Sequence, residues 1–429
     1  MASMIAVDDL RVGMYIHLEG GWLSHPFPLS SFRIAAPDQI ATLRGLGLMQ
    51  VSWVPEKSEL EAAAGPDDAE GFGPAGACAA PVTPPPSAEE TAARARRDWL
   101  AAQREAAQLC ERQHGEAALA WRQAWDNVLS RPQEAGRTAR VLTQAMLDKM
   151  LAAEDVGIRL VHGAADRTAG HALNVTIISM LIGRTLGLAD AELADLGVGA
   201  LLHDVGKQEV AERYRHGEEG FGAAELTLYR DHVAKGVAQG RRMSLSPGAL
   251  AVLGQHHEHA DGSGFPLQLG SDRLTMGARI VAIVNRYDNL CNPNNRTAAL
   301  TPHEAVSMLF AQGRSRYDGT VLNTFIRMMG VYPAGSLVQL TDDRYGMVVG
   351  VNSSRPLKPR VLVHERLDAA TEHAPQLLDL ERAADIGIRR SLGPAKVPAK
   401  VLQALDPRPR VAYYFESIAR EDQAAALAA

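Results

Sequence analysis

The sequence predicts a multidomain, mainly α-helical protein with a small α/β N-terminal domain, an all-helical core and a small β-rich C-terminal module. Three observations lead to this prediction. The chain has 429 residues, enough for about three domains of ~150 residues each. A stretch rich in Ala, Gly and Pro at 59–87 interrupts the apolar pattern. The spacing of apolar residues then changes from helical to alternating near residue 331.

Residues 1–58 are expected to form the α/β domain. β-like runs at Met14–Leu18, Phe32–Ile34 and Val51–Val54 surround one helical stretch, Pro37–Leu46. Proline suits the first turn of that helix, because its missing N–H would have no helical partner there.

The segments 59–87 and 88–139 are expected to be a linker and a helical connector. The first contains three consecutive prolines and no periodic apolar face, which is typical of a flexible linker. The second is rich in Ala, Glu, Arg and Gln, and Ser87 is placed as its N-cap. It could be a signalling or dimerising helix, or simply a solvated helix packed on one side.

Residues 140–330 are expected to be helical and 331–429 β-rich. In the first range, apolar residues repeat at helical spacing, as in Ile177, Ile178, Leu181 and Ile182. The expected strands of the second range are Ser336–Leu340, Tyr345–Val351 and Arg360–His364.

Composition limits the chemistry. The net charge of −6 gives no electrostatic case for binding a DNA or RNA polymer or an anionic membrane. Three cysteines without a CxxC pair exclude a disulfide scaffold and a cysteine-rich zinc module, so His and carboxylate must hold any metal. No apolar stretch approaches the ~20 residues of a membrane span. Since Met1–Leu10 also has no signal pattern, we expect a soluble, cytoplasmic protein.

An adjacent pair, His203-Asp204, ends an apolar helical stretch. An imidazole and a carboxylate at neighbouring positions can bind one metal ion, or the carboxylate can bridge two. Lys207 follows at a spacing that shares a helix face and could offer its ammonium group to a phosphate. The alternative is a partly buried His–Asp hydrogen bond beside a surface lysine.

A second pair, His256-His257, precedes a glycine-rich loop, Asp261–Pro266. Consecutive helical residues point about 100° apart, so the two imidazoles could serve two metals, or a metal and a substrate. Glycines in the loop allow close approach of a ligand to the backbone. A His-His pair on its own is usually a surface feature, and the first pair is what makes this one notable.

These motifs resemble the HD-GYP family of metal-dependent phosphohydrolases. The resemblance covers about 140–330 and rests on His203–Lys207, His256-His257-Glu258, Asp261–Pro266 and Arg279–Leu290. The segment Val7–Lys57 is similar to the domain of unknown function that often precedes HD-GYP. Its Val12–Ile16 and Trp22–Phe27 carry that likeness.

The resemblance implies hydrolysis of the bacterial second messenger cyclic di-GMP to pGpG and then GMP at a centre of two or three metals. His203, Asp204 and Lys207 would be catalytic, and Lys207, Arg296, Gly262, Gly264 and Phe265 would contact substrate. The implied metal ligands are His171, His203, Asp204, His232, His256, His257 and Asn285. Imidazole and carboxylate ligands suit iron or manganese, with zinc behind them, and two such ions can bridge a hydroxide.

Three positions depart from the family pattern. Asn285 stands where the family usually has an aspartate ligand, with Asp288 as the second aspartate, so metal affinity should be lower. Phe265 replaces the signature tyrosine and lacks its hydroxyl. Arg167 lies four residues before His171, where three-metal members have glutamate, which argues for two metals rather than three.

The sequence leaves three functions open. The first is a cyclic di-GMP phosphodiesterase, whose activity could be reduced by Asn285. The second is a catalytically weakened HD-GYP domain that acts as a cyclic di-GMP sensor or a protein-interaction adaptor. The third is an HD phosphohydrolase for another nucleotide, against which the glycine-rich loop argues. A diguanylate cyclase or another signalling protein could be a partner, and the helix at 88–128 makes a homodimer plausible.

Overall fold

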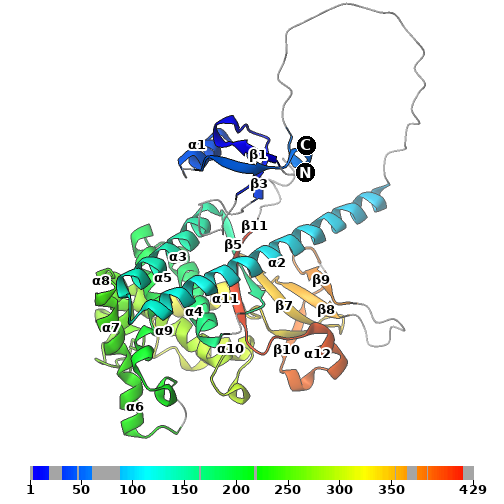
Figure 1. The fold of residues 1–429 in the computed structure, drawn as a ribbon. Coiled ribbons are helices and arrows are strands. Elements are labelled where there is room, and N and C mark those ends of the chain that lie inside the picture. The colour runs from blue at the N-terminus through cyan, green and yellow to red at the C-terminus, as the bar shows by residue number, and fades with distance from the viewer. Residues whose placement is uncertain are drawn as a thin grey trace, which may run out of the picture. The chain divides into compact units, whose positions relative to one another are not determined.

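A computed structural model describes residues 3–18, 31–45, 48–59, 87–163, 166–216, 220–352, 354–364, 374–383 and 385–418 (Figure 1). The chain divides into two compact units, Met1–Arg104 and Glu105–Ala429. Within the described ranges, no helix is both long enough and apolar enough to cross a membrane.

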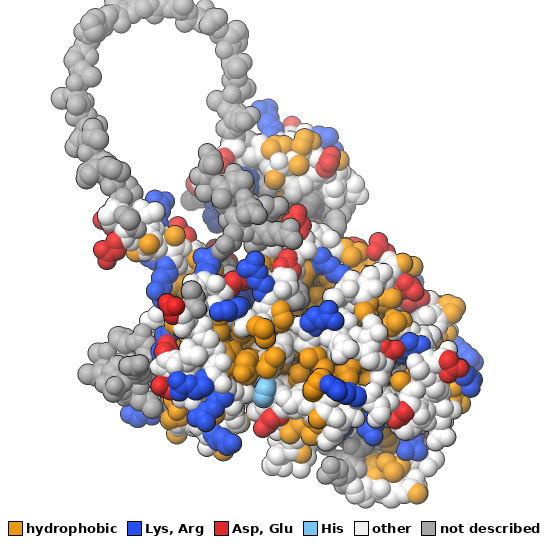
Figure 2. Space-filling view, turned by 180° about the vertical axis from the view of Figure 1, so that it is seen from behind, with side chains coloured by type: hydrophobic (Ala, Val, Ile, Leu, Met, Phe, Trp, Pro, Cys, Tyr) orange, Lys and Arg blue, Asp and Glu red, His pale blue; other side chains and the backbone are white. Residues whose placement is uncertain are grey.

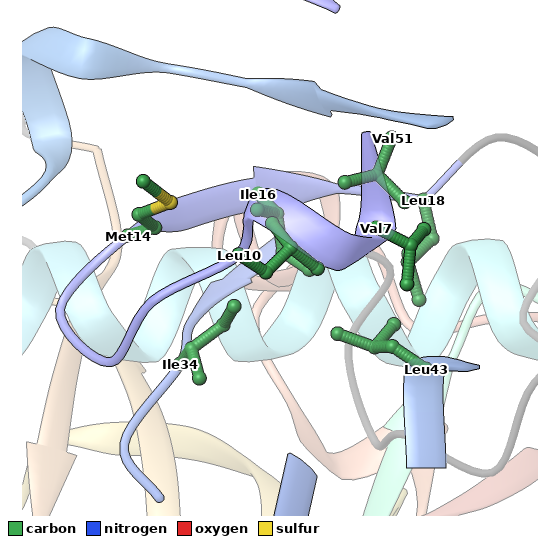
Figure 3. Packing of buried hydrophobic residues seen from close by; sticks show 8 residues of the cluster. All are labelled: Val7, Leu10, Met14, Ile16, Leu18, Ile34, Leu43 and Val51. Carbon is green, nitrogen blue, oxygen red and sulfur yellow. The ribbon is translucent and has the colours of Figure 1, made fainter. Parts of the chain in front are cut away.

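The first unit contains a four-stranded antiparallel sheet and one helix. The sheet has the order β1 (Ser3–Ala6), β4 (Gln50–Trp53), β2 (Tyr15–His17) and β3 (Ser31–Arg33), and the helix is α1 (Pro37–Gly45). Figure 3 shows its core of Val7, Leu10, Met14, Ile16, Leu18, Ile34, Leu43 and Val51. The expected α/β domain is confirmed, and β1 is an additional strand. The motif Trp22–Phe27 and all but the ends of 59–87 lie outside the described residues.

Two long helices follow, α2 (Ala88–Asn127) and α3 (Pro132–Ala152). The N-terminus of α2 is closed by a reciprocal pair: the Glu90 amide donates to Ser87 Oγ at 3.1 Å and the Ser87 amide donates to Glu90 Oε2 at 2.9 Å. The expected N-cap is thus present. Within the second unit, Trp121 of α2 is buried and donates to the carbonyl of Leu201 at 3.3 Å.

The helices of the core pack against one another through apolar faces. Its helices are α4 (Arg167–Thr185), α5 (Asp190–Leu202), α6 (Ala223–Arg230), α7 (His232–Arg242), α8 (Pro247–Gln255), α9 (Met276–Cys291), α10 (Pro302–Gln312) and α11 (Gly319–Met329). Helix α5 packs against α3, α4 and α8, and α4 also packs against α9. A short 3-10 turn, η4 (Val205–Glu209), packs on α7, where a Cβ at Gly206 would lie 2.0 Å from the carbonyl oxygen of His232.

The C-terminal module is built on a seven-stranded antiparallel sheet. Its strands are β5 (Asp155–Val161), β6 (Leu337–Leu340), β7 (Tyr345–Asn352), β8 (Arg360–His364), β9 (Gln376–Asp379), β10 (Ile388–Leu392) and β11 (Ala412–Ile418). The order is β10-β6-β7-β5-β11, with β8 pairing both β7 and β9. Helix α12 (Ala399–Leu405) supplies Val401 and Leu405 to one of the apolar clusters around this sheet. The three expected strands are confirmed.

The expectation of an all-helical core has one exception. Residues 155–161 form β5, which lies between β7 and β11 and pairs with β11 from Asp155↔Ile418 to Val161↔Ala412. The run contains Val156, Ile158 and Val161, which favour a strand, but its partner lies about 250 residues later in the chain. The mainly α architecture with its α/β and β-rich ends is otherwise as expected.

Figure 2 shows one face of the molecule, on which Lys and Arg side chains are interspersed with acidic and apolar ones. On the described residues of this face, no continuous basic stripe is visible.

Candidate metal centre

Four helices bring histidine and aspartate side chains together in the core. His171 lies in the first turns of α4, and His203 and Asp204 follow the last residue of α5. His232 is the first residue of α7, and His256 and His257 follow α8. Helix α5 is apolar and buried from Leu196 to Leu202, so its end delivers His203 and Asp204 to the interior, where they are 0% and 8% exposed.

These side chains form two ligand groups that share Asp204. One group is His171, His203 and Asp204, and the other is Asp204, His232, His256 and His257. Asp204 Oδ2 lies 3.6 Å from His171 Nε2 and 3.4 Å from His203 Nε2. Its Oδ1 lies 3.6 Å from His232 Nε2 and 3.9 Å from His256 Nε2. A carboxylate with one oxygen in each group is the arrangement that bridges two cations.

The proton on each of four imidazoles is assigned by its surroundings. His203 Nδ1 donates to the Ala200 carbonyl at 2.7 Å, and His232 Nδ1 donates to the Tyr229 carbonyl at 2.5 Å. His256 Nδ1 donates to the Leu253 carbonyl at 2.9 Å, and His171 Nδ1 donates to Asp288 Oδ2 at 2.6 Å. Because a neutral imidazole carries one proton, each Nε2 is unprotonated and has a free lone pair.

These lone pairs face each other. His171 Nε2 lies 3.2 Å from His203 Nε2, and His232 Nε2 lies 3.3 Å from His256 Nε2. Two unprotonated nitrogens at that distance repel each other unless a cation accepts both lone pairs. Histidines whose other nitrogen is held by a carbonyl or carboxylate are typical metal ligands.

The protonation states also suit a metal. Burial lowers the pKa of His232 to about 4 and holds the pKa values of His256 and His257 well below the usual value, so these imidazoles are neutral. Burial alone would raise the pKa of Asp204, but the neighbouring Lys207 ammonium outweighs it and keeps the carboxylate ionised. Asp204 Oδ1 is buried and has no hydrogen-bond partner in the described structure. The residues therefore fit a divalent metal centre.

Lys207 reaches the centre from the 3-10 turn rather than from a continuing helix. Its Nζ donates to Asp204 Oδ2 at 2.6 Å and lies 5.6 Å from the ring centroid of Tyr229. Burial alone would lower the pKa of Lys207, but Asp204 outweighs it and raises that pKa, so the ammonium stays charged. A mostly buried ammonium group at this position can bind a phosphate oxygen.

The glycine-rich loop covers the second ligand group. The Phe265 ring stacks on the His257 ring, with centroids 4.4 Å apart and planes 19° apart. Gly262 has a φ of +76°, and a Cβ at Gly264 would lie 2.4 Å from Glu258 Cα. The buried Glu258 carboxylate accepts from the amides of Leu267 and Leu269, at 2.6 and 3.0 Å, and so holds the loop in place.

Two further predicted residues lie apart from these contacts. Asn285 is buried on α9, and its Oδ1 accepts a hydrogen bond from Asn289 Nδ2 at 2.6 Å. Its role as a metal ligand stays a prediction. Arg296 is exposed on the 3-10 turn Arg296–Ala298.

Comparison with known protein families finds two matches in this chain. A model of the HD domain matches residues 142–321, and a model of a domain of unknown function, DUF3391, matches residues 3–139. The HD-domain model thus spans most of the helical core. The resemblance to the HD-GYP family, with that domain of unknown function ahead of it, is confirmed.

Curated relatives are similar to this chain over different shares of its length. A cyclic di-GMP phosphodiesterase of Pseudomonas aeruginosa is 28% identical over 394 residues, which cover 89% of this chain and 90% of the relative. A 3'3'-cGAMP-specific phosphodiesterase of Vibrio cholerae is 28% identical over 35% of this chain and 33% of its own length. Among solved structures, an HDG"Y"P protein from Bdellovibrio bacteriovorus matches with a TM-score of 0.40 and 14% identity, over 76% of this chain and 98% of that chain.

The helical core also contains residues that support the ligands. The sequence named Asp288 only as the second aspartate of the family pattern, and it did not single out Asn174 or Tyr229. Asp288 Oδ2 holds His171, while its Oδ1 accepts from Asn174 Nδ2 at 2.7 Å and from Asn292 Nδ2 at 2.9 Å. Tyr229 places its hydroxyl 3.4 Å from His257 Nε2. A sequence signal existed for Asn174, because it lies three residues after His171 on the same helix face. Nothing local marks Tyr229.

Proposed function

We propose that this chain is a metal-dependent phosphodiesterase that hydrolyses cyclic di-GMP to pGpG, GMP or both. The observation that carries the proposal is the pair of opposed Nε2 contacts on either side of the shared Asp204. The P. aeruginosa relative, similar over 89% of this chain, supports the choice of substrate.

The proposed ligands of two divalent ions are His171, His203, Asp204, His232, His256 and His257, with Asn285 as a further, uncharged candidate. Iron or manganese is proposed ahead of zinc, because the ligands are imidazoles and carboxylate without thiolate. Bound divalent ions supply Lewis-acid chemistry, lowering the pKa of water and neutralising charge on phosphate oxygens.

The chain's own residues perform the remaining tasks. Lys207 binds a phosphate oxygen with an ammonium group that Asp204 keeps protonated. The Phe265 ring stacks on His257 and shields the second ligand group from water. Gly262 and Gly264 let the loop backbone lie close to the histidines and to the substrate.

The test is hydrolysis by the purified full chain supplied with Mn(II) or Fe(II). We expect conversion of cyclic di-GMP to pGpG or GMP, and loss of turnover in His203→Ala and Asp204→Ala. Because one relative acts on 3'3'-cGAMP, that dinucleotide belongs in the same assay. If the chain cleaved 3'3'-cGAMP but not cyclic di-GMP, the substrate would be a different cyclic dinucleotide from the one proposed.

A second candidate is a sensor or adaptor that binds cyclic di-GMP without cleaving it. Asn285 favours it, because an amide at this position brings no charge to the ions. Binding of the dinucleotide with no hydrolysis under any metal would establish this reading. For either function we propose a cytoplasmic location and a signalling partner such as a diguanylate cyclase, with homodimerisation through the helix at 88–128.

A further inference from the structure

The C-terminal module is attached to the metal centre through Asn292, which ends α9. Its Nδ2 donates to Asp288 Oδ1 and to the Val411 carbonyl, both at 2.9 Å, and its Oδ1 accepts from the Val411 amide at 3.0 Å. Asn174 of α4 donates to the same Val411 carbonyl at 3.0 Å and accepts from the Tyr413 amide at 2.9 Å. The first residues of β11 are thereby fixed against the helices that carry His171 and Asp288.

Two arginines flank this attachment. Arg410 directly precedes Val411. Arg167 begins α4, one turn before His171, and its Nε donates to the Asn292 carbonyl at 3.2 Å, while its Nη1 lies 3.0 Å from His216 Nδ1. The Arg167 guanidinium and the backbone beside Arg410 therefore lie next to the same asparagine, which itself contacts Asp288.

These guanidinium groups have unused donors. Arg410 Nε is buried without a hydrogen-bond partner among the described residues. Arg167 Nη2 makes no hydrogen bond to any part of the chain that the structure describes. An unpaired buried donor is unfavourable, and a guanidinium offers several donors in a planar fork that matches phosphate oxygens.

The local charge also favours an anion. Burial lowers the pKa of Arg410, and the neighbouring charges of Arg296 and Arg167 lower it further. The nearby carboxylates are already engaged: Asp166 pairs with Arg122 at 3.3 Å and caps the Thr168 amide. Asp288 is occupied by His171 and the two asparagines.

We propose that Arg167 and Arg410, with the exposed Arg296 at the rim, form a phosphate-binding site beside the metal centre. The inference rests on the proposed function in taking the phosphate to be that of a cyclic dinucleotide or its linear product. Arg410 lies outside residues 142–321, the range of the HD-domain match, so the C-terminal module supplies part of the substrate site.

The first test measures dinucleotide affinity by calorimetry in the full chain carrying Asp204→Asn, which prevents turnover. Arg167→Gln and Arg410→Gln should each weaken binding of cyclic di-GMP by about 10- to 100-fold, the range expected for a charged hydrogen bond. Arg410→Lys, which keeps the charge but loses the fork, should fall between wild type and Arg410→Gln. Arg408→Gln, two residues away and paired with Asp406, is the matched control and should change little.

The second test uses inorganic phosphate and chelator-treated protein, so that neither metals nor the identity of the dinucleotide enters. Phosphate should raise the melting temperature of wild type but not of the Arg167→Gln/Arg410→Gln double variant. If phosphate binds in this way while no cyclic dinucleotide is cleaved, the arginine site stands and the proposed function fails. Equal affinities in wild type and the arginine variants, or no binding of either probe to wild type, would overturn the site.

Discussion

At the level of single residues, the centre depends on which imidazole nitrogen carries the proton. Carbonyls or a carboxylate hold the Nδ1 of four histidines, so their Nε2 atoms point at one another and at Asp204. Asp288 is one of these supports, since it orients His171 and is itself bound by Asn174 and Asn292. Partners of this kind typically contribute 10- to 100-fold to metal affinity.

Asp288→Asn is therefore expected to weaken metal binding by about 10- to 100-fold, because an amide can no longer hold the His171 proton as a charged acceptor. The measurement is competition with a chelator of known affinity. Asp231→Asn is the control, since that exposed carboxylate pairs with Lys235 at the surface. Equal losses in both variants would show that net charge, rather than orientation of His171, is responsible.

Asn285→Asp is expected to tighten metal binding, because it adds a carboxylate at the position where the HD-GYP resemblance places a ligand. The same chelator competition measures the effect. Asn285 Oδ1 accepts from Asn289, so Asn289→Asp provides a matched charge on the next turn of α9. Should the two variants bind metal alike, or should neither differ from wild type, Asn285 is not a ligand position.

At the level of elements, the loop after His257 is held by its contacts with Glu258. The Glu258 carboxylate binds two loop amides, and Gly264 passes so close to Glu258 that a Cβ cannot be accommodated. The sequence analysis predicted that the glycines allow the loop backbone to lie close to a neighbouring group. It did not predict the Glu258 contacts, because these depend on how the loop folds back to bring the amides of residues 267 and 269 to the carboxylate.

Gly264→Ala is expected to destabilise the second unit by about 1–3 kcal/mol and to reduce hydrolysis, because the backbone of 257–259 must shift. Thermal unfolding and turnover measure the two effects. Gly115→Ala, an exposed position in α2 with no atom near the added Cβ, should instead leave turnover unchanged and stabilise the helix slightly. Normal stability and turnover in Gly264→Ala would mean that the loop is not held as described.

The strands show where local patterns stop being informative. Alternating apolar residues predicted β6, β7 and β8, which are neighbours in both sequence and space. They could not predict that β5 would leave the helical range and join β11, because pairing across about 250 residues has no local signature. For the same reason, Arg410 and its approach to Arg167 were not visible in the sequence, whereas the histidine motifs were.

At the level of the whole molecule, buried neutral histidines couple stability to pH. His114 of α2 is 1% exposed and packs edge-on against Tyr414 of β11, and burial lowers its pKa to about 4. The unfolded chain takes up a proton near 6.5 while the folded chain resists it until about 4. The stabilising effect is thus complete above pH 6.5 and is lost as the pH falls toward 4.

His114→Leu should remove about 3 kcal/mol of this pH dependence, as expected for a shift of about 2.5 units. Denaturant unfolding of chelator-treated protein at pH 7 and at pH 4.5 measures it. The variant should lose less stability between the two pH values than wild type does. Identical losses in both proteins would mean that His114 takes up its proton in the folded state as readily as in the unfolded chain.

The central claim is a centre of two metals built around one shared carboxylate, and its most direct test is metal stoichiometry. The full chain, purified without chelators and then equilibrated with excess Mn(II), is analysed for metal bound per chain. We expect two ions in wild type, and loss of metal from both positions in Asp204→Asn, since Asp204 belongs to both ligand groups. At most one ion per chain in wild type, or two ions retained by Asp204→Asn, would contradict the account.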